Sequence, residues 1–228
     1  MNKGKFIVFE GIEASGKSTQ MNLLTEKLIK KEIKIVDTSE PTNSLIGKLI
    51  REAYLSGISQ IDHLSLAKLF AADRSNHVYG FIRPTLNNAI NVISDRYMLS
   101  SLAYQIKENE VSKDTVMSLN CNIIKPDLTI YIDITPEISI ERINKRSNRK
   151  EIFDNIEKLT IIRNQYLEGI NYLSDYNIQI VDGNRSYDAI HNDIMELIDS
   201  IILSKLNDEN SFIQNKSSLD EFKEKHLN

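Results

Sequence analysis

The sequence predicts an α/β fold in which a five-stranded parallel sheet is flanked by helices. Two observations predict it: short apolar runs rich in β-branched residues, and helical patterns between those runs. Runs that are apolar at nearly every position indicate strands buried on both faces, as in parallel sheets. The expected strands are Phe6–Glu10, Ile33–Thr38, Asn91–Asp95, Leu128–Ile134 and Ile178–Asp182.

Two local patterns place helices between these strands. The expected first helix runs from Ser18 to about Lys31, and its apolar face is formed by Met21, Leu24 and Leu28. After the fourth expected strand, residues 135–137 read Thr-Pro-Glu, the order of an N-cap, a proline in the first turn and an early acidic residue. We therefore expect a helix to begin at Pro136.

Length and composition predict one globular domain. Of the 228 residues 41% are hydrophobic, enough for a full core, and we expect a single domain over residues 1–204. Residues 205–228 are rich in Asn, Ser, Lys, Glu and Asp, so we expect a frayed helix or disorder there. The net charge of -4 argues against nucleic acid as a main partner, because nucleic-acid binding usually needs a basic face.

Cysteine usage and hydropathy bear on the compartment. Cys121 is the only cysteine, which excludes an internal disulfide and a cysteine-rich metal site, and we expect it to be a buried thiol. The first residues lead directly into a strand, and no run of about 18 apolar residues occurs. We therefore expect no signal segment and no membrane partner, and the sequence favours a cytoplasmic protein.

A phosphate-binding loop (P-loop) follows the first expected strand. Residues 11–19 read Gly-Ile-Glu-Ala-Ser-Gly-Lys-Ser-Thr and match G-x-x-x-x-G-K-[ST] at every fixed position. The glycines let successive N–H groups point at phosphate oxygens, Lys17 reaches the outer phosphates, and Ser18 offers its hydroxyl to Mg²⁺. The motif predicts a P-loop NTPase-type three-layer sandwich, and the alternative is a glycine turn that binds nothing. The predicted nucleotide-binding residues are Gly11, Glu13, Ala14, Ser15, Gly16, Lys17, Ser18 and Thr19.

A carboxylate ends the third expected strand. Asp95 lies at its carboxyl end, where ligands bind in open α/β sheets. We expect Asp95 to hold or orient Mg²⁺ and the next residue, Arg96, to bridge phosphates. The alternative is a salt bridge at the end of the strand.

Two helical segments carry candidate base-binding groups. Phe70 and Arg74 lie four residues apart and share a helix face, so a pyrimidine stacked on Phe70 would receive a hydrogen bond from Arg74. Ser101, Tyr104 and Gln105 likewise share one side of a helix, which suits contact with a base and sugar. The alternatives are a core phenylalanine and a solvated helix face.

Basic residues recur three to four positions apart between Arg142 and Lys150. With a P-loop present, we expect a lid at about residues 142–154. Its cations, among them Arg146 and Arg149, would close over the transferring phosphoryl group and exclude water. The alternative is a solvated charged face.

In combination these residues resemble the thymidylate kinases, which phosphorylate dTMP to dTDP. The resemblance spans about Lys5 to Ile201. It implies a five-stranded parallel sheet between helices, ATP as donor, Mg²⁺, a role in dTTP synthesis, and a homodimer formed by helix packing. The segments that carry it are Phe9 to Gln20, Ser39-Glu40-Pro41-Thr42, Leu69 to Arg74, Asp95 to Gln105, Lys125-Pro-Asp127 and Arg142 to Arg149.

The resemblance also implies roles at the acceptor site. Phe70 would stack on thymine, and Arg74 would bind a thymine carbonyl. Tyr104 would crowd the 2′ position of the sugar, and Arg96 would grip the acceptor phosphate. Ser101 would sit near the ring edge, and Glu13 and Asp95 would lie near the sugar hydroxyl and the metal. The expected acceptor site also includes Gln105, Glu40 and Pro41.

On the donor side, the resemblance implies that the P-loop cradles ATP, that Arg142 lies near adenine and that Gly183 lies close to the base. Arg146 or Arg149 would close on the transferred group. The expected catalytic residues are Lys17, Arg96, Arg146 and Arg149, which would stabilise the transition state.

Two departures from the family pattern concern arginines. Some members place an arginine in the P-loop where this chain has Ala14, and here the lid holds the arginines instead. Many members place an arginine before Glu-Pro, where this chain has Ser39. Lys48 and Arg51 are the candidate substitutes for that second arginine.

Other functions stay open on the sequence. A deoxynucleoside kinase needs a committed base, whereas Arg96 suits an anionic acceptor, such as dTMP or another nucleoside monophosphate. A GTPase-like switch expects Asn-Lys-x-Asp, and the segment that resembles it begins at Asn215 in the polar tail. A catalytically silent nucleotide-binding homologue differs from an enzyme only in activity.

Overall fold

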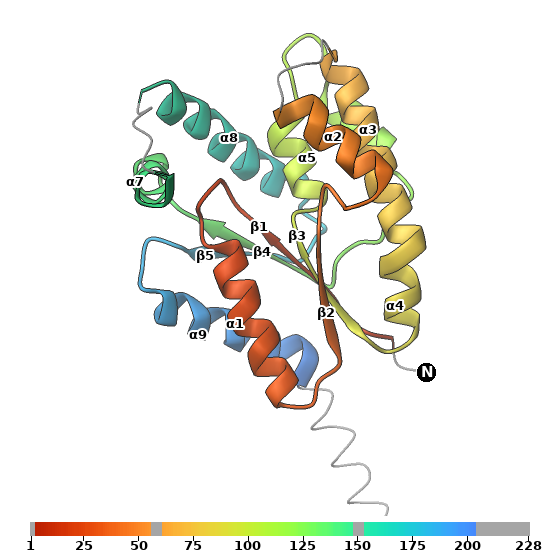
Figure 1. Ribbon diagram of the computed structural model, residues 1–228, viewed down its shortest axis with the longest axis vertical. Helices are drawn as coiled ribbons and strands as arrows, with labels where there is room; N and C mark the ends of the chain where they lie inside the picture. The colour runs from red at the N-terminus through yellow and green to blue at the C-terminus, as the bar shows by residue number, and fades with distance from the viewer. Residues whose placement is uncertain (1–2, 56–60, 148–152, 204–228) are drawn as a thin grey trace, which may run out of the picture.

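The sheet of the computed structural model has five strands, all parallel, in the order β2-β3-β1-β4-β5. The structure describes residues 3–55, 61–147 and 153–203 (Figure 1). Because β1 is central and the chain crosses from one side of it to the other, the P-loop lies where the strand order reverses, the usual ligand position. The strands are β1 Phe6–Glu10, β2 Ile35–Ser39, β3 Asn91–Asp95, β4 Leu128–Asp133 and β5 Ile178–Asp182.

The five expected strands are confirmed, with bounds that differ by at most two residues at either end. Burial on both faces is confirmed for the central strands β1 and β4, and for the middle of β3. It is wrong for the outer strands β2 and β5, which leave several positions exposed. An outer strand has a neighbour on one side only, so helices and strands cover it less completely.

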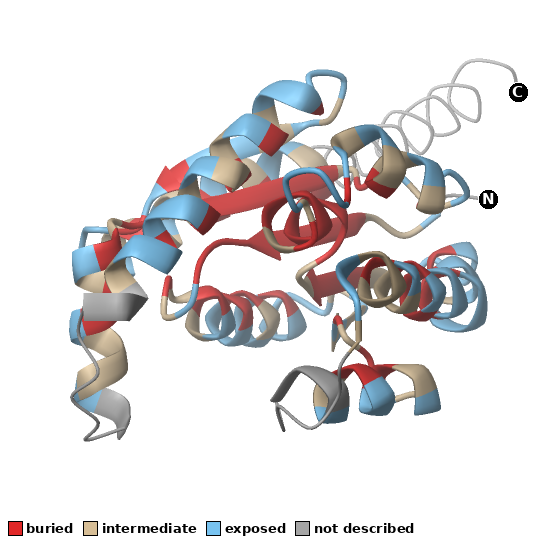
Figure 2. Ribbon diagram, turned by 90° about the horizontal axis from the view of Figure 1, so that it is seen from above, coloured by how far each residue is buried: buried red, intermediate tan, exposed pale blue. Residues whose placement is uncertain are grey.

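Helices cover both faces of the sheet and make three layers (Figure 2). Side chains alternate along β1, so Phe6 and Val8 enter one core cluster, with residues of α5 and α8, while Ile7 and Phe9 enter the other, with residues of α1 and α9. The expected three-layer α/β sandwich is therefore confirmed. The helices are α1 Lys17–Lys30, α2 Leu45–Leu55, α3 His63–His77, α4 Arg83–Asn87, α5 Met98–Tyr104, α6 Lys113–Leu119, α7 Pro136–Ser147, α8 Phe153–Tyr172 and α9 Tyr187–Ile198, with π-helical turns η1 Val78–Ile82 and η2 Asp199–Leu203.

Two helix starts bear on the sequence predictions. Helix α1 begins at Lys17, one residue earlier than expected, and Gly16 in the left-handed conformation is its N-cap. Helix α7 begins at Pro136 as expected, and the Thr135 hydroxyl accepts a hydrogen bond from the N–H of Ile138 at 3.4 Å. Because α1 begins at Lys17, the amino end of this helix lies at the P-loop.

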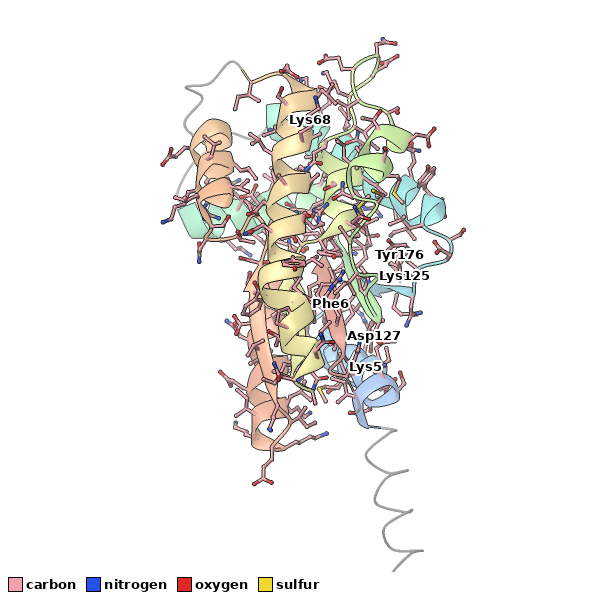
Figure 3. The ribbon with its side chains drawn as sticks, turned by 90° about the vertical axis from the view of Figure 1, so that its right-hand side faces the viewer. Lys5, Phe6, Lys68, Lys125, Asp127 and Tyr176 are labelled. Carbon is pink, nitrogen blue, oxygen red and sulfur yellow. The ribbon has the colours of Figure 1, made fainter. Side chains whose placement is uncertain are left out.

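A lysine and an aspartate fasten the amino ends of β1 and β4. Asp127 accepts hydrogen bonds from Nζ of Lys5 at 2.7 Å and from the N–H of Phe6 at 2.8 Å. Nearby, Nζ of Lys125 lies 4.8 Å from the ring centre of Tyr176 (Figure 3). The segment Lys125-Pro-Asp127, which belongs to the family resemblance, therefore holds strands together at the edge of the sheet opposite the P-loop.

Further expectations concern the cysteine, membrane-spanning helices, the lid and the tail. Cys121 is exposed, so the expectation of a buried thiol is wrong; it lies just beyond α6, where the chain passes over the surface. No helix in the described part of the chain has the length and apolarity needed to cross a membrane. The middle of the expected lid, residues 148–152, and the tail from 204 onward lie outside the described residues.

Candidate active site

The P-loop takes backbone conformations that favour glycine. Gly11 has φ 151° and Gly16 has φ 101°. A Cβ atom on Gly11 would lie 2.6 Å from Oγ of Ser15 and 2.7 Å from the carbonyl oxygen of Ile132, so a larger residue does not fit. The loop thus curls tightly before α1, whose first N–H groups have no acceptor within the helix and face the loop.

Lys17 is buried inside this loop, with only 7% of its surface exposed. Its Nζ donates to the carbonyl oxygens of Gly11 at 3.0 Å and Ile12 at 3.2 Å. Burial, with the positive charge of Arg96, lowers the pKa of Lys17 to about 8. The ammonium group therefore lies where the loop would cradle phosphates, and an anion there would restore its ordinary pKa.

Ser18 and Asp95 form a pair that fits a hard cation. The hydroxyl of Ser18 lies 3.4 Å from Oδ2 of Asp95. The other oxygen, Oδ1, is buried and has no hydrogen-bond partner among the described residues. The described residues hold no group of three or more His, Cys, Asp or Glu side chains able to bind a metal. A Mg²⁺ ion at this pair would take its remaining oxygen ligands from phosphates and water, as Mg²⁺ commonly does.

A cavity of about 420 Å³, the acceptor cavity, adjoins this pair. It lies between the ends of β2 and β3 and the helices α2, α3 and α5, which Figure 1 shows grouped together on one side of the sheet. Except for Glu13 and Ser101, all the residues expected at the acceptor site line it. The lining residues are Ser39, Glu40, Pro41, Ile50, Arg51, Leu66, Phe70, Arg74, Asp95, Arg96, Ser100, Tyr104 and Gln105.

Arg74 lines the acceptor cavity and is 1% exposed. Its Nε donates to Oε2 of Glu40 at 2.8 Å, and its Nη2 donates to the carbonyl oxygen of Tyr97 at 2.8 Å. Its Nη1 donates to Oγ of Ser101 at 2.8 Å and Oδ1 of Asn120 at 2.7 Å. Of the five guanidinium N–H groups, one on Nη2 has no acceptor among the described residues. Protein contacts thus fix the plane of Arg74 and leave one donor for a ligand.

Arg96 also lines the acceptor cavity and directly follows Asp95 in the chain. Its Nη1 donates to Oγ of Ser100 at 3.1 Å and to the Tyr166 hydroxyl at 3.0 Å, and its Cζ lies 5.0 Å from the ring centre of Tyr104. Within the described part of the chain, Nε and Nη2 have no hydrogen-bond acceptor. Burial alone would lower the pKa of Arg96, but the nearby tyrosines and carboxylates outweigh burial and raise it. Arg96 is therefore a permanent cation with donors left for an anion.

Comparisons with known proteins agree with this geometry. The thymidylate kinase family model matches residues 9–194. This chain belongs to the thymidylate kinase family. It is similar to the probable thymidylate kinases of Thermococcus gammatolerans (39% identical over 208 residues, 88% of this chain and 99% of the relative) and Thermococcus onnurineus (41% over 208 residues, 88% and 100%). It is also similar to the thymidylate kinase of Leptospira interrogans, with 38% identity over 202 residues, 88% of this chain and 96% of the relative.

Two residues that the family resemblance put in the acceptor site lie outside its cavity. Ser101 is fully buried, and its hydroxyl accepts from Arg74, so the expectation that it lies near the ring edge stays a prediction. Because α5 begins at Met98, its neighbour Ser100 faces the cavity instead. The side chain of Glu13 is exposed at the P-loop, and its carbonyl oxygen accepts from Oγ of Ser139 at 2.7 Å.

The structure also separates the two candidates for the arginine that this thymidylate kinase lacks at Ser39. Arg51 lines the acceptor cavity together with Ser39, whereas Lys48 is exposed and does not line it. Nη1 of Arg51 donates to the carbonyl oxygen of Pro41 at 2.7 Å, and Nη2 donates to that of Thr42 at 2.6 Å. Of these two residues, only Arg51 therefore lies at the acceptor cavity.

The donor side brings Arg142 and Gly183 together beside the P-loop. Nη2 of Arg142 donates to the carbonyl oxygen of Gly183 at 2.9 Å, and Nη1 lies 3.3 Å and 3.4 Å from the carbonyl oxygens of Ala14 and Ser15. Tyr187, which the sequence did not single out, has its ring centre 6.0 Å from Cζ of Arg142. The side chain of Arg146 and the whole of Arg149 lie outside the described residues, so their roles stay predictions.

A buried network centred on Glu10, which carries no motif signal in the sequence, supports Arg96. Oε1 of Glu10 accepts from the N–H groups of Tyr97 and Ser100, and Oε2 accepts from the hydroxyls of Ser100 at 2.6 Å and Tyr166 at 3.1 Å. Burial raises the pKa of Glu10 and raises that of Tyr166 well above its usual value. The hydroxyls of Ser100 and Tyr166 also accept from Arg96, so Glu10 fixes the position of Arg96 through these two side chains.

Proposed function

We propose that this member of the thymidylate kinase family transfers the γ-phosphoryl group of Mg-ATP to dTMP, giving dTDP and ADP for dTTP synthesis. One observation carries the proposal. A single cavity is lined by Phe70 and Arg74, which we take as its base end, and by Arg96 and Asp95, which we take as its phosphate end, and Asp95 is paired with Ser18 of the P-loop. The acceptor phosphate would therefore lie directly beside the donor phosphates.

At the base end, Phe70 would stack on thymine and the remaining N–H of Arg74 would donate to a thymine carbonyl. Tyr104 and Gln105 line the same cavity, where Tyr104 would crowd the 2′ position of a ribose. Glu40 and Pro41 would close the cavity from the β2 side, and Glu13 would lie near the metal. The position of each residue at the cavity or the P-loop and the family resemblance support these roles.

At the phosphate end, the reaction needs little covalent help from the protein. The second pKa of a phosphate monoester is about 6, so the acceptor is already mostly dianionic at pH 7, and a general base is not needed. Lys17, Arg96 and the lid arginines Arg146 and Arg149 would neutralise charge as the phosphoryl group moves in line. Bound Mg²⁺ would neutralise phosphate charge, with Ser18 and Asp95 as its protein ligands.

At the donor end, Gly16, Lys17, Ser18 and Thr19 would cradle the phosphates of ATP. Arg142 would lie near the adenine, because its hydrogen bond to Gly183 places its guanidinium at the rim of the loop. The edge of the adenine would then lie against that side of the loop.

We also propose a cytoplasmic homodimer formed by helix packing. Large apolar side chains are exposed on α2 and η1: Leu45 is 84% exposed and Tyr79 is 76% exposed. A partner subunit would cover such side chains. Light scattering of the purified chain tests the dimer directly, and a mass of 26.1 kDa would contradict it.

Competing functions make different predictions in one assay. ADP release is measured with Mg-ATP and each of dTMP, dUMP, UMP, CMP, AMP, GMP and thymidine, with EDTA as the control. We expect metal-dependent turnover that is fastest with dTMP. Preference for another monophosphate would overturn the roles given to Phe70, Arg74 and Tyr104, preference for thymidine would overturn that of Arg96, and no turnover would indicate a silent homologue.

A further inference from the structure

A buried chain of hydrogen bonds runs from β2 to the base end of the acceptor cavity. Oγ1 of Thr38 lies 2.8 Å from Nε2 of His77, and Nδ1 of His77 lies 3.1 Å from Oε1 of Glu40. Oε2 of Glu40 then accepts from Nε of Arg74 at 2.8 Å. His77, Glu40 and Arg74 are all buried, so water does not compete strongly for these contacts.

The direction of these hydrogen bonds follows from the chemistry of the groups. An ionised carboxylate only accepts, so Nδ1 of His77 carries the proton and donates to Glu40. In the neutral imidazole, Nε2 then accepts from the hydroxyl of Thr38. Glu40 thereby selects the tautomer with the proton on Nδ1, Thr38 holds the other ring nitrogen, and each oxygen of Glu40 has one donor among the described residues.

Packing also fixes the imidazole ring. Phe81 stacks on His77 with ring centres 5.8 Å apart and an interplanar angle of 17°. Thr38 and His77 line a second cavity of about 670 Å³, which shares Ser39 and Asp95 with the acceptor cavity, whereas Glu40 and Arg74 line the acceptor cavity alone. The network therefore connects residues of the two cavities, and His77 itself does not line the acceptor cavity.

We propose that His77, oriented by Thr38, is a positioning residue for the base end of the acceptor site. The proposal rests on the proposed function in one respect, the role of Arg74 in binding the base. Without His77, Oε1 of Glu40 loses its only donor among the described residues. The buried carboxylate then turns toward a new partner, and Nε of Arg74 loses its alignment. The consequence is weaker binding of the nucleotide base, with the phosphoryl-transfer geometry at Arg96 unchanged.

The test is steady-state kinetics of the full chain with saturating Mg-ATP and varied dTMP, together with a thermal unfolding curve for each variant. We expect His77→Ala to raise KM for dTMP about tenfold and to leave kcat within about twofold, because the lost contact acts on binding. His77→Asn keeps an N–H at the place of Nδ1 and should bring KM back to within about threefold of wild type. His63→Ala, at the exposed start of α3, is the matched control and should leave both constants unchanged.

Thr38→Val removes the hydroxyl at nearly constant shape and should raise KM for dTMP about threefold. If His77→Ala does not fold, His77→Gln replaces it, since glutamine reaches toward Thr38 and not toward Glu40. The proposal then requires a higher KM for the glutamine variant than for the asparagine variant.

An unchanged KM in His77→Ala, or an asparagine variant no better than alanine or glutamine, overturns the proposal. A fall in kcat and in melting temperature at constant KM also overturns it, because that pattern indicates a merely structural residue. Failure of the proposed function gives a different result, in which wild type does not turn over dTMP or Arg74→Lys leaves its KM unchanged.

Discussion

The strands begin at one edge of the sheet, the amino edge, and end at the opposite edge, the carboxyl edge. Each edge holds a lysine and an aspartate, but the contacts of these residues differ between the two edges. At the amino edge, both oxygens of Asp127 are paired, with Nζ of Lys5 and the N–H of Phe6 (Figure 3). At the carboxyl edge, Oδ1 of Asp95 is buried and has no partner in the described part of the chain. Lys17 at the same edge is buried against backbone carbonyls, which lowers its pKa.

The difference separates residues that hold the fold from residues that await a ligand. A satisfied pair contributes stability and has nothing left to bind. An unpaired carboxylate oxygen and a desolvated ammonium cost free energy in the free protein, and a bound metal and phosphates relieve that cost. We therefore expect substitutions at the carboxyl edge to change kinetics and substitutions at the amino edge to change only stability.

The largest expected effect is that of Lys17→Met. Removing the ammonium from the P-loop should lower kcat/KM for dTMP phosphorylation by about 10³-fold, because no other described lysine reaches the loop. ADP release under saturating Mg²⁺ measures it. The control is Lys68→Met, an exposed lysine on α3 (Figure 3) that should behave as wild type. Wild-type turnover in Lys17→Met with normal nucleotide binding would remove Lys17 from the mechanism.

Arg96→Met is expected to follow. Loss of the cation at the phosphate end should lower kcat/KM for dTMP by about 10²-fold or more, since charge-assisted contacts to phosphate are strong and directional. Arg83→Met, on the exposed surface of α4, is the matched control. An effect confined to melting temperature would place Arg96 with the residues that only hold the fold.

Phe70→Ala tests the base end. Stacking of a base on an aromatic ring contributes about 1 to 3 kcal/mol, so KM for dTMP should rise by about tenfold or more with a smaller change in kcat. Ile161→Ala on α8, which is 52% exposed and lies outside the acceptor cavity, is the control. Equal losses in kcat and kcat/KM would indicate that Phe70 acts on the transition state and not on base binding.

The pKa of Lys17, lowered to about 8, gives a prediction on pH. The protonated lysine binds phosphate, so kcat/KM for Mg-ATP should fall above pH 8, by about tenfold at pH 9. At saturating Mg-ATP the fall should move to higher pH, because bound phosphates stabilise the ammonium. A kcat/KM that stays constant up to pH 9 would contradict a pKa of about 8 for Lys17.

Stability should change in the opposite sense over that range. The unfolded chain keeps the Lys17 proton up to about 10.5, whereas the folded chain releases it near 8. Between these values the unfolded state binds more protons, so this group makes folding more favourable as pH rises. A loss of activity between pH 8 and 9 therefore cannot come from unfolding driven by Lys17.

The smallest kinetic effect is expected at the amino edge. Asp127→Ala should lower the free energy of unfolding by about 1 kcal/mol, because it leaves the N–H of Phe6 without its acceptor. Both kcat and KM should stay at wild-type values. Lys5→Ala should destabilise less, because Asp127 would keep its contact with Phe6. A urea titration measures the stability of each variant, and steady-state kinetics measure its kcat and KM. A raised KM in either variant would contradict the claim that residues at the amino edge affect only stability.

Much of the carboxyl edge could be predicted because short segments determine it. The P-loop lies within nine consecutive residues, from Gly11 to Thr19, and Asp95 and Arg96 follow directly from an apolar strand. Local spacing also placed Phe70 with Arg74, since four residues make about one helical turn. These predictions needed no knowledge of contacts between distant segments.

The rest of the site depends on such contacts. Glu10 ends an apolar run and looks like a strand residue, yet its partner Tyr166 is 156 residues away on α8. The choice between Ser100 and Ser101 depends on where α5 begins, and one residue rotates a helical side chain by about 100°. His77 carries no motif signal, because its meaning comes only from its contacts with Thr38 and Glu40.

The most direct measurement is calorimetric binding of dTMP and of thymidine to wild type and to Arg96→Met. If the carboxyl edge binds the acceptor phosphate through Arg96, wild type will bind dTMP much more tightly than thymidine. The variant will lose most of that preference and keep its affinity for thymidine. A variant that keeps the preference, or loses thymidine binding to the same degree, would contradict the division of the cavity into a base end and a phosphate end.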